Sequence, residues 1–144
     1  MKTEEIILAW EVDCEIDKTE LGKESLIIPQ LHSKYLKEFY MAKTAYVKYN
    51  QDYKNTYKIK YQYYQGLLSK EELEEHGWDA QPLKILKADI PVYLESDDDL
   101  QLIKNKIKLT EDKIEILENI IRTLNNRGYL IKNAIEWERF KMGL

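Results

Sequence analysis

Two long stretches of the chain place apolar or aromatic residues at helical spacing and dominate its hydrophobic pattern. In the first, tyrosines occupy positions 46, 49, 53, 57, 61 and 64, and these steps of three and four residues mark one face of an α-helix. The run from Gln30 to Gln65 contains neither glycine nor proline. It therefore predicts one helix of about 36 residues, roughly 54 Å long. We expect this helix to begin near Pro29 and to end at Gly66.

The second stretch lies near the C-terminus and carries a heptad repeat. Its seam residues are Ile103, Ile107, Thr110, Ile114, Leu117, Ile121 and Leu124. The same phase continues past Gly128 to Ile131, Ile135 and Met142. Packing against the tyrosine-bearing helix explains part of this seam, and self-association is compatible with that packing. Because isoleucine occupies so many seam positions, the pattern favours a homo-oligomer of more than two subunits.

Shorter elements are expected outside these two helices. Ile6, Ile7, Trp10 and Cys14 indicate one apolar face of an N-terminal amphipathic segment. A turn comes after this segment, and Thr19 is the candidate N-cap of the next element.

Residues 66–96 form an irregular connector. Ser69 opens a capping box that predicts a helix of one or two turns. Pro82 is among the glycines and prolines that interrupt the rest of the connector. Residues 90–94 include a proline and are expected to be extended, while Ser96 is the expected N-cap of the last long helix.

Together these elements predict an all-α fold of long antiparallel helices joined by an irregular acidic connector. We expect an N-terminal helical region at residues 1–96, which contains the basic helix at 30–65 and the connector at 66–96. Residues 97–144 are expected to form a C-terminal helical region used for oligomerisation.

Charge is segregated along the chain, although its total is only −4. Residues 30–65 carry seven lysines against Glu38 and Asp52, whereas residues 66–100 carry three lysines against ten acidic residues. Solubility alone would not predict such blocks. A basic, aromatic-rich helix inside an acidic chain indicates a polyanionic ligand, and the acidic segment is a candidate surface for docking a protein.

Composition narrows the class of protein further. The single cysteine, Cys14, excludes an intrachain disulfide framework. No run approaches the roughly 18 apolar residues of a membrane span, and the first residues lack the basic start of a signal peptide. We therefore expect a soluble intracellular protein without a membrane partner. One third of the residues are charged and only two are phenylalanine, so much of the apolar surface needs a partner chain.

Catalysis is poorly supported by the sequence. His32 and His76 lie far apart, without ligand-spaced cysteine or carboxylate neighbours, which is more typical of surface residues than of metal ligands. No glycine-rich phosphate-binding loop is present. A tyrosine nucleophile for DNA cleavage usually needs surrounding Arg and His, and the chain has only three arginines. We expect neither an enzyme nor a metal or other cofactor.

The lysines and tyrosines of the first long helix suit single-stranded nucleic acid. Such binding needs cations that replace condensed counterions and flat rings on which bases stack. The candidate residues are Lys54, Lys58, Lys60, Tyr57, Tyr61 and Tyr64. On a helical wheel most of the tyrosines share a narrow arc that is more typical of packing, so the lysines are the stronger candidates for contact. Attachment to a membrane surface is the weakest alternative, because it would favour Leu, Phe or Trp over tyrosine.

Several motifs resemble those of one phage protein family. Residues 57–66, YKIKYQYYQG, are similar to the Lys-x-Lys/Arg and Tyr-Tyr-x-Gly signature of the UvsY recombination mediators of large tailed phages. Residues 126–132, NRGYLIK, resemble the Arg-Gly-aromatic-x-Ile-Lys ending of that family. Residues 33–36, SKYL, resemble its Ser-Lys-Trp-Leu, and residues 86–100 have similar spacing. The resemblance covers most of the chain.

This resemblance implies a non-enzymatic protein that forms ring-like homo-oligomers and binds single-stranded DNA. Such proteins help a RecA-like recombinase to replace the single-strand-binding protein in the cytoplasm of the infected bacterial host. By the resemblance, the basic pair that contributes to DNA binding falls on Lys58 and Lys60. Lysine at position 60, where the family can have arginine, keeps the charge but loses bidentate contact with phosphate.

Oligomerisation is expected to use the heptad seam together with the C-terminal ending. The candidate residues are Ile103, Ile107, Ile114, Leu117, Ile121, Leu124, Arg127, Tyr129, Ile131, Ile135 and Phe140. The alternative function is a helical oligomeric adaptor that does not bind DNA directly, and it predicts the same assembly.

Overall fold

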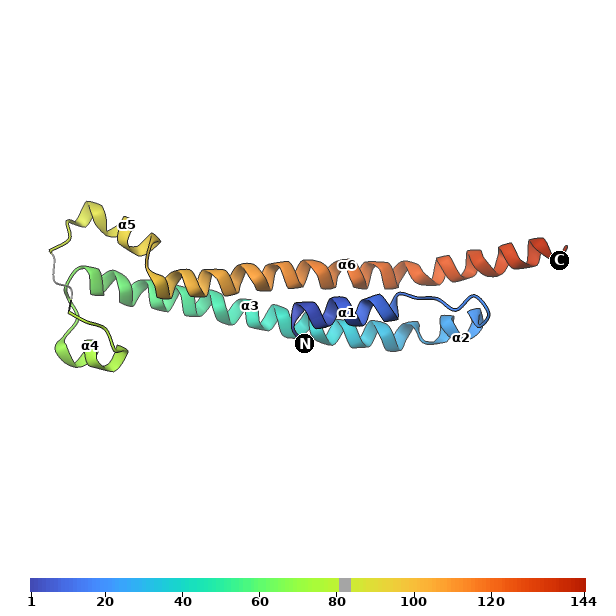
Figure 1. Ribbon diagram of the computed structural model, residues 1–144, viewed down its shortest axis with the longest axis horizontal. Coiled ribbons are helices and arrows are strands. Elements are labelled where there is room, and N and C mark those ends of the chain that lie inside the picture. The colour runs from blue at the N-terminus through green and yellow to red at the C-terminus, as the bar shows by residue number, and fades with distance from the viewer. Residues whose placement is uncertain (81–83) are drawn as a thin grey trace. The chain divides into compact units, whose positions relative to one another are not determined.

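The computed structural model describes residues 1–80 and 84–144, and this part of the chain contains helices and no strand (Figure 1). The all-α class predicted from the sequence is therefore confirmed. The elements are α1 (Thr3–Asp13), α2 (Leu21–Leu26), α3 (Ile28–Tyr64), α4 (Lys70–His76), the 3₁₀ helix η1 (Lys87–Asp89), α5 (Ile90–Glu95) and α6 (Asp98–Lys141). Pro82, one of the expected interruptions, lies outside the described residues.

The chain packs into two compact units. The first contains residues 1–44 and 111–144, and the second contains residues 45–110. Helices α3 and α6 contribute a segment to each unit, and the two segments within a unit run antiparallel. The boundary expected between residues 96 and 97 was drawn between a DNA-binding region and an oligomerisation region, not between packed units. That functional division stays a prediction.

The core of the first unit joins α1, the first half of α3 and the middle of α6. Its buried residues are Ile6, Tyr35, Ala42, Leu117, Ile120 and Leu124. Trp10 packs edge to face on Tyr35, with 5.5 Å between the ring centroids. The Tyr35 hydroxyl donates to the Asp13 carboxylate at 2.8 Å, so the polar end of this buried ring has a partner.

The N-terminal helix is confirmed as α1, but only two of the four residues predicted for its apolar face lie on the face that packs. Ile6 is buried and Trp10 packs against the same core. Ile7 and Cys14 are exposed. A turn of 100° per residue carries Ile7 away from the face that Ile6 shares with Trp10, and Cys14 comes after the last residue of the helix.

The second unit is built around α5 and the start of α6. Ile90, Leu94 and Leu100 are buried there, and Tyr53, Tyr61, Tyr64 and Ile85 pack against them. The prediction that residues 90–94 are extended was wrong. Pro91 stands in the first turn of α5, where a missing N–H interrupts no helical hydrogen bond. Ile90 and Leu94, four residues apart, both point into the core.

Several predicted helix ends are confirmed. Helix α3 ends just before Gly66, whose φ of 75° lies in the left-handed region. Ser69 caps α4, because its hydroxyl accepts a hydrogen bond from the Glu72 backbone at 3.2 Å. Helix α6 continues through Gly128 to Lys141.

Two predicted caps were wrong. Asp97, rather than Ser96, caps α6, and its carboxylate accepts from the Leu100 backbone N–H at 3.0 Å. The Ser96 hydroxyl instead donates to the backbone of α5. Thr19 does not cap α2, whose N-cap is Glu20. The Thr19 hydroxyl donates to the Asp17 carboxylate in the preceding turn, so it is already engaged.

Candidate nucleic-acid interface

One face of α3 in the second unit is exposed and basic. It consists of Lys48, Gln51, Lys54, Asn55 and Lys58, all of which are exposed. On a helical wheel these five residues share an arc of about 120°. We call them the basic face. It presents ammonium groups that can replace counterions on phosphate, and amides that can both donate and accept hydrogen bonds.

Only part of the basic face was anticipated from the sequence. Lys54 and Lys58 were singled out as DNA-contact candidates, whereas Lys48, Gln51 and Asn55 were not. The signal that would have found them is the arc opposite the tyrosine stripe, which holds lysines, amides and the exposed Val47 but no acidic residue. Its role in DNA contact stays a prediction.

Lys60 lies on another side of α3 and is buried. Its ammonium is 3.1 Å from the Asp97 carboxylate and 2.8 Å from the Asp99 carboxylate. It also lies over the Trp78 ring, 4.0 Å from the centroid. Two residues along a helix correspond to a turn of about 200°, so Lys58 and Lys60 face different surroundings. In this structure Lys60 is therefore paired within its own chain, whereas the resemblance assigned it to contact with DNA.

The buried charges of this cluster are stabilised by hydrogen bonds. Burial opposes ionisation of Lys60, but its bonds to Asp99 and Asp97 outweigh burial and raise the pKa of the ammonium. Burial likewise opposes ionisation of Asp97. Hydrogen bonds from the Tyr64 hydroxyl at 2.6 Å, from the Leu100 backbone and from Lys60 nevertheless lower the pKa of that carboxyl. Asp97 thus joins the end of α3 to the start of α6.

The three tyrosines proposed for DNA contact have different surroundings. Tyr61 is half-buried and packs against the core of the second unit. Tyr64 packs there too, and its pKa is raised by burial and by its hydrogen bond to Asp97. Tyr57 is 40% exposed. The packing interpretation of the tyrosine stripe is thus supported for Tyr61 and Tyr64, while Tyr57 presents a ring to solvent.

The predicted oligomerisation residues fall into two groups. Most are buried or half-buried within their own unit: Ile103, Ile107, Ile114, Leu117, Ile121, Leu124, Arg127 and Ile131. The exposed ones are Tyr129, Ile135 and Phe140. Sequence reasoning missed Trp137, which is exposed and stacks on Phe140 with 5.6 Å between ring centroids. The end of α6 therefore exposes aromatic surface.

Arg127 holds the loop between α1 and α2 against α6. Its guanidinium donates to the backbone carbonyls of Asp13 and Glu15 and pairs with Glu24 at 3.0 Å. Only 2% of the residue is exposed. The arginine of the C-terminal motif is therefore used within one chain, because its planar fork reaches several acceptors at once.

Among the residues that the structure describes, no group of three or more His, Cys, Asp or Glu is placed to hold a metal ion. Nor does the described part of the chain contain a helix sufficiently long and apolar to cross a bilayer.

These features define an all-α protein of long helices with an exposed basic face, and such a face suits a polyanionic ligand. The family described as the recombination, repair and ssDNA binding protein UvsY matches residues 9–144. The chain belongs to this family.

Three crystal structures of the recombination mediator protein UvsY of bacteriophage T4 have the same fold. Lattice type II aligns with a TM-score of 0.83 at 20% identity, covering 99% of this chain and 98% of that one. Lattice type IV gives 0.82 at 19%, covering 97% and 99%. Lattice type I gives 0.81 at 19%, covering 95% and 98%. No curated protein sequence matches the chain significantly.

Proposed function

We propose that this protein is a recombination mediator that binds single-stranded DNA through the basic face of α3. It acts as a homo-oligomer of more than two subunits and helps a RecA-like recombinase to load onto DNA coated by single-strand-binding protein. The observation that carries the proposal is the exposure of Lys48, Lys54 and Lys58 on one acid-free face, in a chain whose family is described as ssDNA-binding.

The mechanism is binding without turnover. Each lysine on the basic face replaces a counterion on one phosphate, and release of that ion favours binding at low salt. One subunit offers few such contacts. When several subunits bind the same strand, the later contacts are intramolecular, and avidity rises by a factor on the order of 10² or more. A strand held against several such faces is extended or bent, which loosens its coating protein.

The assembly is proposed to use the exposed end of α6. Tyr129, Trp137 and Phe140 are each more than half exposed, and large exposed aromatic side chains are typical of protein contacts. The acidic segment at 66–100 is proposed to dock the recombinase or the coating protein, because an acidic surface repels phosphate and attracts basic protein surfaces.

The decisive experiment measures retention of a labelled oligonucleotide on a filter over a range of salt concentrations. Lys54→Ala with Lys58→Ala should weaken binding and reduce the salt slope by about 0.7 for each phosphate that the variant no longer binds. The matched control is Lys70→Ala with Lys87→Ala, which removes the same charge from exposed lysines of the connector.

The control pair should leave the salt slope unchanged. Equal effects of the two pairs would refute the basic face as the site. A wild-type protein that retains no strand even at low salt would refute DNA binding and favour the oligomeric adaptor.

A further inference from the structure

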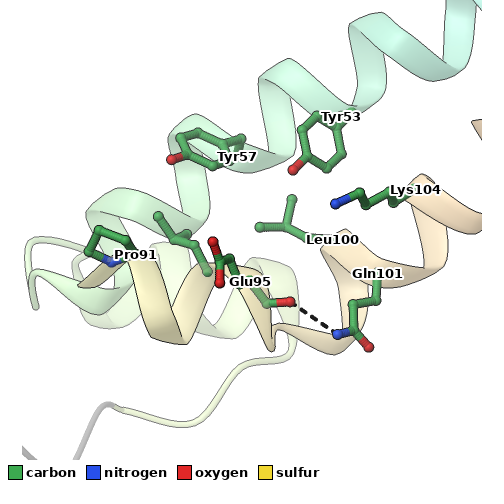
Figure 2. A pocket seen from close by; sticks show the side chains of 8 residues that line it. Tyr53, Tyr57, Pro91, Glu95, Leu100, Gln101 and Lys104 are labelled. Carbon is green, nitrogen blue, oxygen red and sulfur yellow. Dashed lines mark hydrogen bonds between the residues drawn. The ribbon is translucent and has the colours of Figure 1, made fainter. Parts of the chain in front are cut away.

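A pocket in the second unit has a lining that phosphate contact does not explain (Figure 2). It has a volume of about 230 Å³, which is enough for one nucleobase. Its lining comes from α3, α5 and α6: Tyr53, Tyr57, Pro91, Leu94, Glu95, Leu100, Gln101 and Lys104. All of these residues belong to the second unit.

The walls of the pocket suit a flat aromatic group. Tyr53 and Tyr57 lie one turn apart on α3, with 6.1 Å between their ring centroids. Leu100 faces them from α6 (Figure 2). Tyr57 keeps a substantial part of its ring exposed. Stacking on such a ring is open to every base, because every base has a π-face.

Two charged side chains, both exposed to solvent, line the same space. The Glu95 carboxylate and the Lys104 ammonium point toward the space beneath the tyrosine rings (Figure 2). Within the described part of the chain neither side chain makes an ion pair. The Gln101 amide donates to the Glu95 backbone carbonyl at 3.0 Å, which fixes the end of α5 against α6.

The carboxylate is the informative group. A carboxylate repels phosphate, but it accepts hydrogen bonds from the edge of a base. Guanine offers two adjacent N–H donors, at N1 and N2, which match the two oxygens of a carboxylate. Thymine offers one N–H between two carbonyl oxygens. Adenine and cytosine place an amino group beside a ring nitrogen that repels the second carboxylate oxygen.

We propose that this pocket holds one base of the bound strand, stacked on Tyr57 and read by Glu95, with guanine preferred over thymine. Lys104 contacts the neighbouring phosphate. The inference rests on the proposed function and adds a base-binding subsite to it. Such a subsite gives a modest preference for composition on top of binding that depends chiefly on phosphate.

The test compares two labelled strands of equal length by fluorescence anisotropy with the full chain. One strand contains only thymidine, and the other contains isolated guanines spaced too widely to form quadruplexes. The wild type should bind the guanine-containing strand about tenfold more tightly, the discrimination expected of one bidentate contact. Glu95→Gln should bring the ratio close to one, because glutamine offers one acceptor and one donor in place of two acceptors.

The ratio is the readout, because removing a negative charge strengthens binding to both strands. Glu74→Gln is the matched control, since Glu74 is an exposed acid of α4 outside the pocket and its substitution changes the charge equally. This control should keep the tenfold ratio. Tyr57→Leu should weaken binding to both strands but leave binding to an abasic strand unchanged. Far-UV circular dichroism confirms that each variant is folded.

The outcomes separate this inference from the proposed function. A wild-type ratio of one, or a ratio unaffected by Glu95→Gln, overturns the base subsite while thymidine binding still supports a mediator. Absence of binding to every strand overturns both. If Glu95→Gln changes the mass of the oligomer and leaves the ratio intact, the pocket holds a side chain of another copy, and the subsite is refuted.

Discussion

Removing the charge of Lys58 and removing that of Lys60, the two lysines of the family signature, should affect different properties of the protein. Lys60→Met keeps an unbranched apolar stem over Trp78 but removes the cation that Asp97 and Asp99 surround. Lys58→Met removes an exposed cation of the basic face. The first change should therefore lower stability, and the second should lower DNA affinity.

The structure sets the size of the first effect. The side chains of Lys60 and Asp97 are only 7% and 3% exposed, and removing one partner of a buried pair costs about 3–5 kcal/mol. Asp97 keeps its hydrogen bonds from Tyr64 and Leu100, so we expect a loss near the lower end, about 3 kcal/mol. Asp99 is half exposed and adds little. Lys58→Met is a surface change, worth within about 0.5 kcal/mol.

Urea unfolding followed by tryptophan fluorescence measures stability, at one fixed protein concentration because assembly contributes to it. Lys60→Met should lower the urea midpoint. It should keep the salt slope of strand binding, which is measured without urea, where the variant is folded. Lys58→Met should keep the midpoint and flatten the slope. If Lys60→Met were as stable as the wild type and flattened the slope as much as Lys58→Met, the Lys60 ammonium would be exposed to solvent and would contact DNA. That result would refute the buried ion pair.

Three further expectations concern acid, the loop anchor and the assembly. Folding lowers the pKa of Asp97, so the ionised carboxylate contributes its full stabilisation above the unfolded pKa near 3.8. That stabilisation is lost as pH falls through the lower pKa of the folded state. The urea midpoint of Asp97→Asn should therefore vary less over this pH range than that of the wild type. Arg127→Lys cannot reproduce the fork and should cost about 2–3 kcal/mol in thermal unfolding, with an unchanged melting temperature as the contrary result. Trp137→Ala with Phe140→Ala should lower the mass seen by light scattering without loss of helix, and a wild-type monomer would refute the avidity mechanism.

Features that act through their own backbone were predictable from the sequence. Gly66 and Gly77 both have positive φ at the ends of helices, as their residue type demands. Ser69 caps the helix that its capping-box pattern predicts. The tyrosine spacing indicated a helix because a helix face that packs must repeat every three to four residues, and the absence of glycine and proline from residues 30–65 indicated its length.

Features decided by distant partners were not predictable in the same way. Ser96 and Asp97 are adjacent and both are good caps. Asp97 caps α6, and its carboxylate also meets Lys60 and Tyr64 from α3. Residues 90–94 form a helix whose Ile90 side chain packs into a core shared with α3. No local sequence pattern predicts those contacts, because they join residues that are far apart in the chain.

Because Lys60 is buried, each subunit offers fewer phosphate contacts, and the oligomer must provide more of them. With Lys60 engaged internally, one subunit offers the three lysines of the basic face, at Lys48, Lys54 and Lys58. Three phosphate contacts give a salt slope of about −2, so raising salt fourfold would weaken a single subunit roughly twentyfold. Contacts made by several subunits on one strand add their slopes. A measured slope near −2, or about −3 if Lys104 adds its proposed phosphate contact, therefore means that one subunit binds each strand. A markedly steeper slope requires that several basic faces share the strand.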